Sequence, residues 1–114
     1  MFDNYAETVP CKRWHAISIL FANDPSLLNF LFTPSRDELS SSPEDLLCWS
    51  GALSSGQQIL IKIALDIWSG AAQASLEEIL ATLDSYRFEN FLLALEFYRY
   101  GRRVSRMPVN NNYK

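Results

Sequence analysis

The stretch SSGQQILIKIALDIWSG, residues 54–70, carries the start, the end and the packing pattern of one complete helix. Ser54 can accept a hydrogen bond from the backbone N–H of Gln57, and the Gln57 side chain can reach back to the N–H of Ser54, which forms a capping box. Gly70 stands where a residue in the left-handed conformation would end the helix. These signals predict a helix over residues 55–69.

This helix is apolar around nearly its whole circumference. Most of its apolar positions follow the i, i+1, i+4, i+5 spacing of a core-facing helix, and two more aliphatic residues lie outside that stripe. The stripe consists of Ile59, Leu60, Ile63, Ala64, Ile67 and Trp68, and the two further residues are Ile61 and Leu65. Because such a helix must be covered on two or three sides, we expect it at the buried centre of an all-α domain.

Cap and stop signals divide the rest of the chain into shorter helices. In the first half of the chain they predict a helix over 9–21, a second that begins at Asp24-Pro25 and stops before Pro34, one further turn at 35–39, and a helix from Pro43 to Gly51. After the central helix they predict a helix from Ser75 to Leu83 and a last one over 86–100. A strand over 16–21 is the alternative for the first of these, since AISILF suits a strand. No two alternating apolar runs are joined by a hairpin turn, so we favour the helix.

The expected inner faces of the later helices follow the same spacing argument. The helix from Pro43 has three apolar residues available to pack, which are Leu46, Leu47 and Trp49. The apolar stripe of the helix from Ser75 consists of Leu76, Ile79, Leu80 and Leu83, and that of the helix over 86–100 consists of Phe88, Phe91, Leu92, Leu95 and Tyr98. Ser75 with Glu78 forms a second potential capping box. We therefore predict a compact, irregular all-α bundle of five to six helices over residues 1–101, followed by a mobile basic tail over 102–114.

Composition limits the class of protein. The chain has 114 residues, of which 48% are hydrophobic, which excludes disorder as an overall description. No apolar run reaches the roughly 18 residues of a membrane span, and the first residues lack a signal-peptide pattern. Cys11 and Cys48 are too few for a disulfide scaffold, so we expect two reduced, partly buried thiols, although a bond between them stays open. These features predict a cytoplasmic protein without membrane contact.

Charge is segregated along the chain. Residues 1–86 carry four Lys/Arg against eleven Asp/Glu, whereas residues 87–114 carry six against two. Such asymmetry can mark an interaction surface or tail. The alternative is that Arg99, Arg102 and Arg103 only complement the dipole at a helix C-terminus.

Residues 53–58, LSSGQQ, resemble the LSGGQ signature of ABC-type ATPases, with serine in place of the first glycine. In that family the motif opens a helix whose N–H groups meet the nucleotide of the opposing subunit, as an anion-binding helix N-terminus does. The resemblance covers six residues, and no G-x-x-x-x-G-K-[ST] phosphate loop is present in the chain. We therefore interpret the stretch as a capping box and expect no intrinsic ATP binding.

Signals of catalysis and metal binding are absent from the sequence. His15 is the only histidine and lacks the cysteine or histidine spacing of a metal site. There is no G-x-S-x-G elbow, and no pattern marks a carboxyl in a cleft. Residues 77–98 have the outline of a helix-turn-helix, but the second helix is crowded with Phe and Leu, so we expect a helical hairpin packed on the core. We predict a non-enzyme without metal or cofactor.

The remaining signal is a group of aromatic and basic residues at the end of the last helix. Tyrosine and arginine are enriched in the energetically dominant residues of protein interfaces, and they also form platforms for single-stranded nucleic acid. The candidate partner-binding residues are Tyr98, Arg99, Tyr100, Arg102, Arg103 and Arg106.

These observations predict a small regulatory protein that binds another protein, with self-association as one form of that binding. Small helical proteins of this kind occur among phage- and plasmid-borne genes, which is an association and not an inference from residues. The alternative is a nucleic-acid-associated regulator that uses the basic C-terminal segment.

Overall fold

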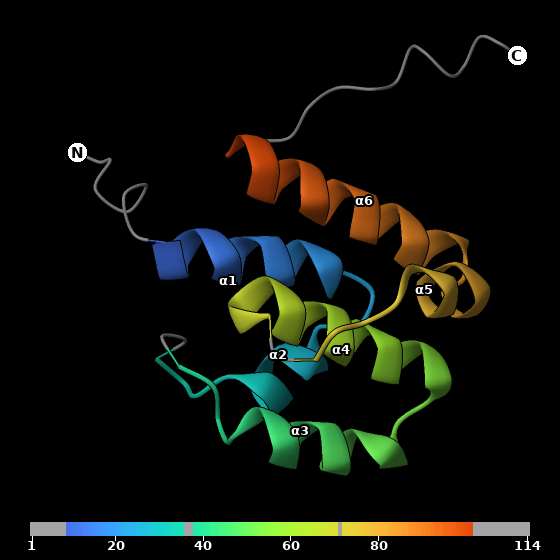
Figure 1. Ribbon diagram of the computed structural model, residues 1–114. Helices are drawn as coiled ribbons and strands as arrows, with labels where there is room; N and C mark the ends of the chain where they lie inside the picture. Colours follow the sequence, from blue (N-terminus) through green and yellow to red (C-terminus); the bar gives the residue numbers. More distant parts are fainter. Residues whose placement is uncertain (1–8, 36–37, 71, 102–114) are drawn as a thin grey trace, which may run out of the picture.

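The computed structural model describes residues 9–35, 38–70 and 72–101, with side chains from residue 12 onward, and in these residues the chain forms six α-helices. Figure 1 shows α6 (Ser85–Tyr100) and α3 (Pro43–Trp49) at opposite edges, with α1 (Val9–Leu20), α2 (Ser26–Leu31) and α4 (Ser55–Ser69) between them. The prediction of a compact all-α bundle is confirmed. The predicted tail over 102–114 lies outside the described residues.

Helix α4 occupies the centre, as its sequence predicts. Ser54 accepts from the N–H of Gln57 at 3.2 Å, and the N–H of Ser54 donates to the Gln57 side chain at 3.3 Å. Gly70 ends the helix with φ 71°, the left-handed conformation that glycine adopts without a steric penalty. The buried residues of α4 are Gly56, Ile59, Leu60, Ile61, Ile63, Ala64 and Leu65. Since they cover most of the circumference of the helix, neighbours must cover α4 on several sides.

Helices α1 and α6 form the most extensive helix pair of the bundle, and α1 also packs on α4. The alternative strand over 16–21 does not form, because α1 continues to Leu20. The fully buried residues at this end of the helix are Ala16, Ile17, Leu20 and, just after it, Phe21. Helix α6 contacts α1 and the loop after it through residues inside and outside its predicted stripe, since Tyr98 of the stripe accepts from Arg13. Phe97 stacks on His15 with ring centroids 6.2 Å apart, and Asn90 donates to Asn23 at 2.8 Å.

The short helices show three departures from the sequence prediction. Helix α2 begins after Pro25 and has no side-chain cap, because the Asp24 carboxylate is used elsewhere. Residues 36 and 37 of the predicted turn at 35–39 lie outside the described residues, and Leu39 at its end forms an antiparallel β-bridge with Phe32 instead of helix. Helix α3 is capped by Ser42 as expected and continues into a 3-10 turn, η2 (Ser50–Ala52), but Trp49 is 54% exposed and packs little.

The α1–α2 loop is fastened to the start of α6 and of α4 by Asp24. Its carboxylate accepts two hydrogen bonds of 2.7 Å from the Arg87 guanidinium and one of 3.2 Å from Gln57. The Arg87 guanidinium holds the pKa of Asp24 below its ordinary value against the effect of burial, and Asp24 in turn raises the pKa of Arg87. Three segments that lie far apart in the sequence are thereby held in a fixed arrangement.

Candidate binding pocket

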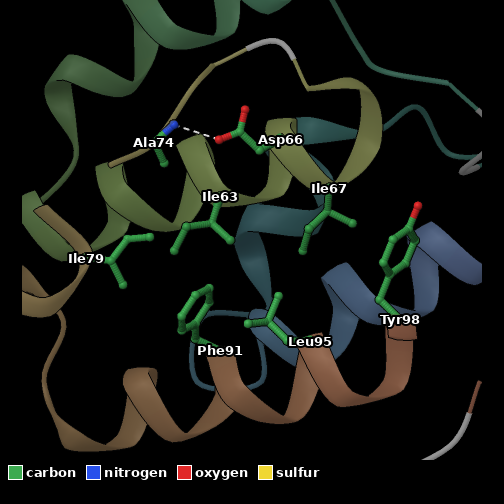
Figure 2. A pocket seen from close by; sticks show the side chains of 8 residues that line it. All are labelled: Ile63, Asp66, Ile67, Ala74, Ile79, Phe91, Leu95 and Tyr98. Atoms are coloured by element: carbon green, nitrogen blue, oxygen red, sulfur yellow. Dashed lines mark hydrogen bonds between the residues drawn. The ribbon is translucent and has the colours of Figure 1, made fainter. Parts of the chain in front are cut away.

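An open apolar pocket of about 290 Å³ lies between the second half of α4 and the middle of α6. Figure 2 shows Ile63 and Ile67 of α4 facing Phe91 and Leu95 of α6 across this space. Ile79, from α5 (Leu76–Thr82), and Tyr98 stand at its opposite ends. The complete lining is Ile63, Asp66, Ile67, Ala74, Ile79, Phe91, Leu95 and Tyr98.

Asp66 is the charged residue of this lining, and its carboxylate is already engaged. It accepts from the backbone N–H groups of Ala72, Gln73 and Ala74 at 3.0, 2.6 and 2.6 Å. Gln73 has a positive φ of 56°, an uncommon conformation that this set of bonds stabilises. Asp66 therefore fixes the α4–α5 loop as a wall of the pocket, and the space itself remains apolar.

Several large apolar side chains of α5 and α6 are exposed. Leu76 and Leu80 are 67% and 64% exposed, although they belong to the same helical stripe as the buried Ile79. Leu95 lines the pocket and is 41% exposed. The prediction that the whole α5 stripe and Leu95 would be internal is therefore wrong.

Cations gather at the Tyr98 end of the pocket. The Arg13 Nε donates to the Tyr98 hydroxyl at 3.2 Å, and the Lys12 ammonium lies 5.3 Å from the centre of the Tyr98 ring. Arg99 is the next residue after Tyr98 in the sequence, and its guanidinium lies 6.0 Å from the centre of the ring of the exposed Tyr100. Within the described part of the chain, no carboxylate forms an ion pair with Lys12, Arg13 or Arg99. We call these three residues the basic end.

Helix α5 supplies Ile79 to the opposite end of the pocket, and its first turn carries two acidic side chains. Glu77 and Glu78 precede Ile79 in the first turn of α5, and both are exposed. Ser75 accepts from the N–H of Glu78 at 3.0 Å, which confirms the cap, while the Glu78 carboxylate lies 3.5 Å from the ammonium of Lys62.

Half of the residues predicted to bind a partner lie in the described structure. Tyr98 lines the pocket, and Arg99 and Tyr100 are exposed next to it. Arg102, Arg103 and Arg106 lie outside the described residues. Sequence reasoning missed Lys12 and Arg13, because nothing in their local pattern indicates contact with a residue that follows about 85 positions later.

The stretch that resembles an ATPase signature is used for internal packing. Gly56 is buried, and a β-carbon there would come within 3.4 Å of the Arg87 guanidinium. The Gln57 side chain accepts from the N–H of Ser54 in the capping box and donates to the Asp24 carboxylate. Gly56 therefore lies against Arg87, and the N-terminus of α4 already lies near a carboxylate of the same chain.

Three further observations concern metal binding, membrane spans and the cysteines. Among the described residues, no group of three or more His, Cys, Asp and Glu is arranged to hold a metal ion. No helix within the described ranges has both the length and the apolar character needed to cross a membrane. Cys48, which we expected to be partly buried, is an exposed free thiol, and the side chain of Cys11 is outside the description.

Comparison of the chain with protein-family models, with curated proteins and with solved structures finds no match.

Proposed function

We propose that this protein acts by binding another polypeptide through the apolar pocket, the exposed leucines beside it and the basic end, and that it catalyses no reaction. The observation that carries the proposal is the apolar pocket between α4 and α6, which has the partly exposed Leu95 in its lining. Leu76 and Leu80 add exposed apolar surface on α5, the helix that supplies Ile79 to the same pocket. Helix-in-groove recognition uses such a surface, in which apolar anchors of one chain enter a gap between helices of another. In this proposal the protein is a small accessory or regulatory protein of the cytoplasm, where a free surface thiol such as Cys48 stays reduced.

Several features support rigid recognition. Asp66 fixes one wall of the pocket, and the Asp24–Arg87 pair fixes the start of α6, which forms another wall. A surface that is already in shape loses less conformational entropy on binding than one that must first become ordered.

The test is capture from native lysate on the full chain as bait. Leu80→Glu and Leu95→Glu place a charge on the proposed surface, and Trp49→Glu places the same charge on an equally exposed apolar site of α3. We expect the first two variants to lose the protein captured by the wild type, and Trp49→Glu to retain it. Equal capture by all four baits would contradict the proposal.

A second candidate function is association with nucleic acid through the basic C-terminal segment. It is favoured by the cations Lys12, Arg13 and Arg99, which gather where that segment begins. Nuclease treatment of the lysate separates the two, because protein capture through apolar anchors survives it. Phosphate contacts would also make binding fall steeply with salt concentration.

A further inference from the structure

We infer that the pocket between α4 and α6 also binds a small amphipathic carboxylate, whose hydrocarbon chain lies along the pocket and whose charged group meets Arg13 and Lys12 at the Tyr98 end. This ligand is a different occupant from the polypeptide of the proposed function. Because both use one pocket, the ligand would compete with the polypeptide and could regulate its binding.

Arg13 closes one end of the space between the two helices. Its guanidinium donates to the backbone carbonyl of Trp68 in the last turn of α4 and, at 3.2 Å, to the hydroxyl of Tyr98 on α6. Tyr98 lines the pocket and stands at one end of it in Figure 2. A side chain that joins the end of α4 to this lining residue of α6 therefore lies at the same end of the pocket.

This end carries two positive charges that suit an anion. The Lys12 ammonium lies 5.3 Å from the centre of the Tyr98 ring. Among the residues that the structure describes, neither Lys12 nor Arg13 forms an ion pair with a carboxylate. A guanidinium has five N–H donors, and the bonds to Trp68 and Tyr98 use two of them. Hydrogen bonds from such cations to a carboxylate are stronger than those between neutral groups.

The rest of the lining requires an apolar ligand body. The Asp66 carboxylate is engaged by three backbone N–H groups of the following loop, and Figure 2 shows its bond to Ala74. A second charged group on the ligand would have no partner there and would be costly to bury. The side chains that face the space between the two ends are aliphatic or aromatic, and they are Ile63, Ile67, Phe91 and Leu95.

The dimensions of the pocket limit the ligand to one short chain. Its volume of about 290 Å³ lies at the lower end of the roughly 300–1,000 Å³ of ligand pockets. Phe91 and Tyr98 lie two turns apart on α6, which is about 10 Å at roughly 1.5 Å per residue. Octanoate has an extended chain of about this length, so it is the probe for the site.

The experiment is calorimetric titration of the purified full chain with octanoate and, separately, with the neutral octanol. We expect saturable binding of octanoate with a dissociation constant below about 1 mM, as ordinary ligand efficiency gives for a ligand of this size. Lys12→Gln and Arg13→Gln should each weaken octanoate by about fivefold or more, because each removes a charge from the carboxylate site. Octanol lacks that charge, so the same variants should change its binding by less than about twofold.

Two further variants separate the charged end from the apolar body. Lys62→Gln removes the same charge from α4, where the ammonium lies 3.5 Å from Glu78, and should leave both titrations unchanged. Leu95→Glu alters the apolar lining and should weaken both probes. Methyl NMR signals of Ile63 and Ile67 should shift with octanoate, which places the ligand in the pocket. Far-UV circular dichroism verifies that each variant is folded.

Two outcomes would overturn the inference. One is the absence of saturable octanoate binding up to about 10 mM, where a ligand of ordinary efficiency would saturate the site. The other is octanoate binding that Lys12→Gln and Arg13→Gln leave unchanged, which would mean that no carboxylate site exists at the Tyr98 end. If lysate capture still depended on Leu95 in either case, the proposed function would stand and only the small ligand would be wrong. Octanoate binding with capture that octanoate does not reduce would support the ligand site and place the polypeptide contact outside the pocket.

Discussion

At the scale of single residues, Asp24 shows how one side chain can hold distant segments together. Its carboxylate is 5% exposed and accepts from two nitrogens of Arg87 and from Gln57. A two-pronged arginine–carboxylate pair fixes orientation as well as distance. The cost of desolvating both charges offsets much of their attraction, so the pair contributes chiefly by selecting one arrangement of the loop, α4 and α6.

We predict that Asp24→Asn lowers the free energy of unfolding by about 1–3 kcal/mol at pH 7, because the partly buried Arg87 guanidinium then keeps only the exposed Asp84 carboxylate, 3.2 Å away, as a counter-charge. The effect should depend on pH. The pKa of Asp24 is lowered in the folded state, so its stabilisation is present above the pKa of an unfolded aspartate, about 3.9, and is lost as the pH falls through the lower folded value. Urea unfolding at pH 7 and at pH 3 measures both.

The difference between wild type and Asp24→Asn should shrink as the pH is lowered from 5 toward 3. Asp45→Asn is the control, since Asp45 is an exposed aspartate on α3. A difference that stays constant over this range would mean that the carboxylate charge is not what stabilises the loop.

At the scale of helices, the ends of a helix can be predicted from the sequence more reliably than the face that its neighbours cover. Caps act within three or four residues, so the ends of α4, α5 and α6 could be predicted from Ser54, Ser75, Asp84, Gly70 and Gly101. Which face of a short helix is covered depends on neighbours that the local pattern does not specify. Trp49, Leu76 and Leu80 were therefore expected inside and are exposed.

The same reasoning explains what was missed in the pocket. Its walls come from α4, the following loop, α5 and α6, and its basic end comes from α1. Tyr98 was identified from the composition around it. Lys12 and Arg13 could only be found once the packing of α1 against α6 was known.

We predict that Ile63→Asp unfolds the domain. Ile63 is 3% exposed on the central helix, and an aspartate there would bury a carboxylate beside aliphatic side chains. A loss of about 4 kcal/mol or more is comparable with the whole stability of a small domain. Thermal melting followed by far-UV circular dichroism measures it. Ser55→Asp, at an exposed position in the first turn of the same helix, should melt close to the wild type, and an unchanged Ile63→Asp would show that α4 is not central.

We predict that Ser75→Ala destabilises the protein by about 0.5–2 kcal/mol, because the N–H of Glu78 loses its acceptor at the start of α5. The midpoint of urea unfolding reports the change. Ser85→Ala is the control, since Asp84 caps α6 and Ser85 does not. Equal midpoints for wild type and Ser75→Ala would mean that this cap contributes nothing to stability.

At the scale of the whole molecule, charge is distributed so that association and folding are separable. The acidic residues lie mainly before residue 87, and five cations with no acid follow Phe97. Exposed charges at a helix end are each worth only about 0.3–1 kcal/mol of stability. The same charges strongly affect the rate and specificity of association. The arginines of the C-terminal segment are therefore expected to matter for partners and not for the fold.

We predict that changing Arg102, Arg103 and Arg106 together to serine leaves the thermal melting temperature within about 2 °C of the wild type, since their contribution to stability is small. The same variant should lose partner capture or dissociate the homo-oligomer. Changing the three asparagines at 110–112 to serine alters the same segment without altering charge, and should affect neither. If the arginine variant keeps both its partners and its mass by light scattering, the segment is not part of the binding surface. The contact must then be carried by the pocket and by the acidic helices before residue 87, where Leu80→Glu would still abolish it.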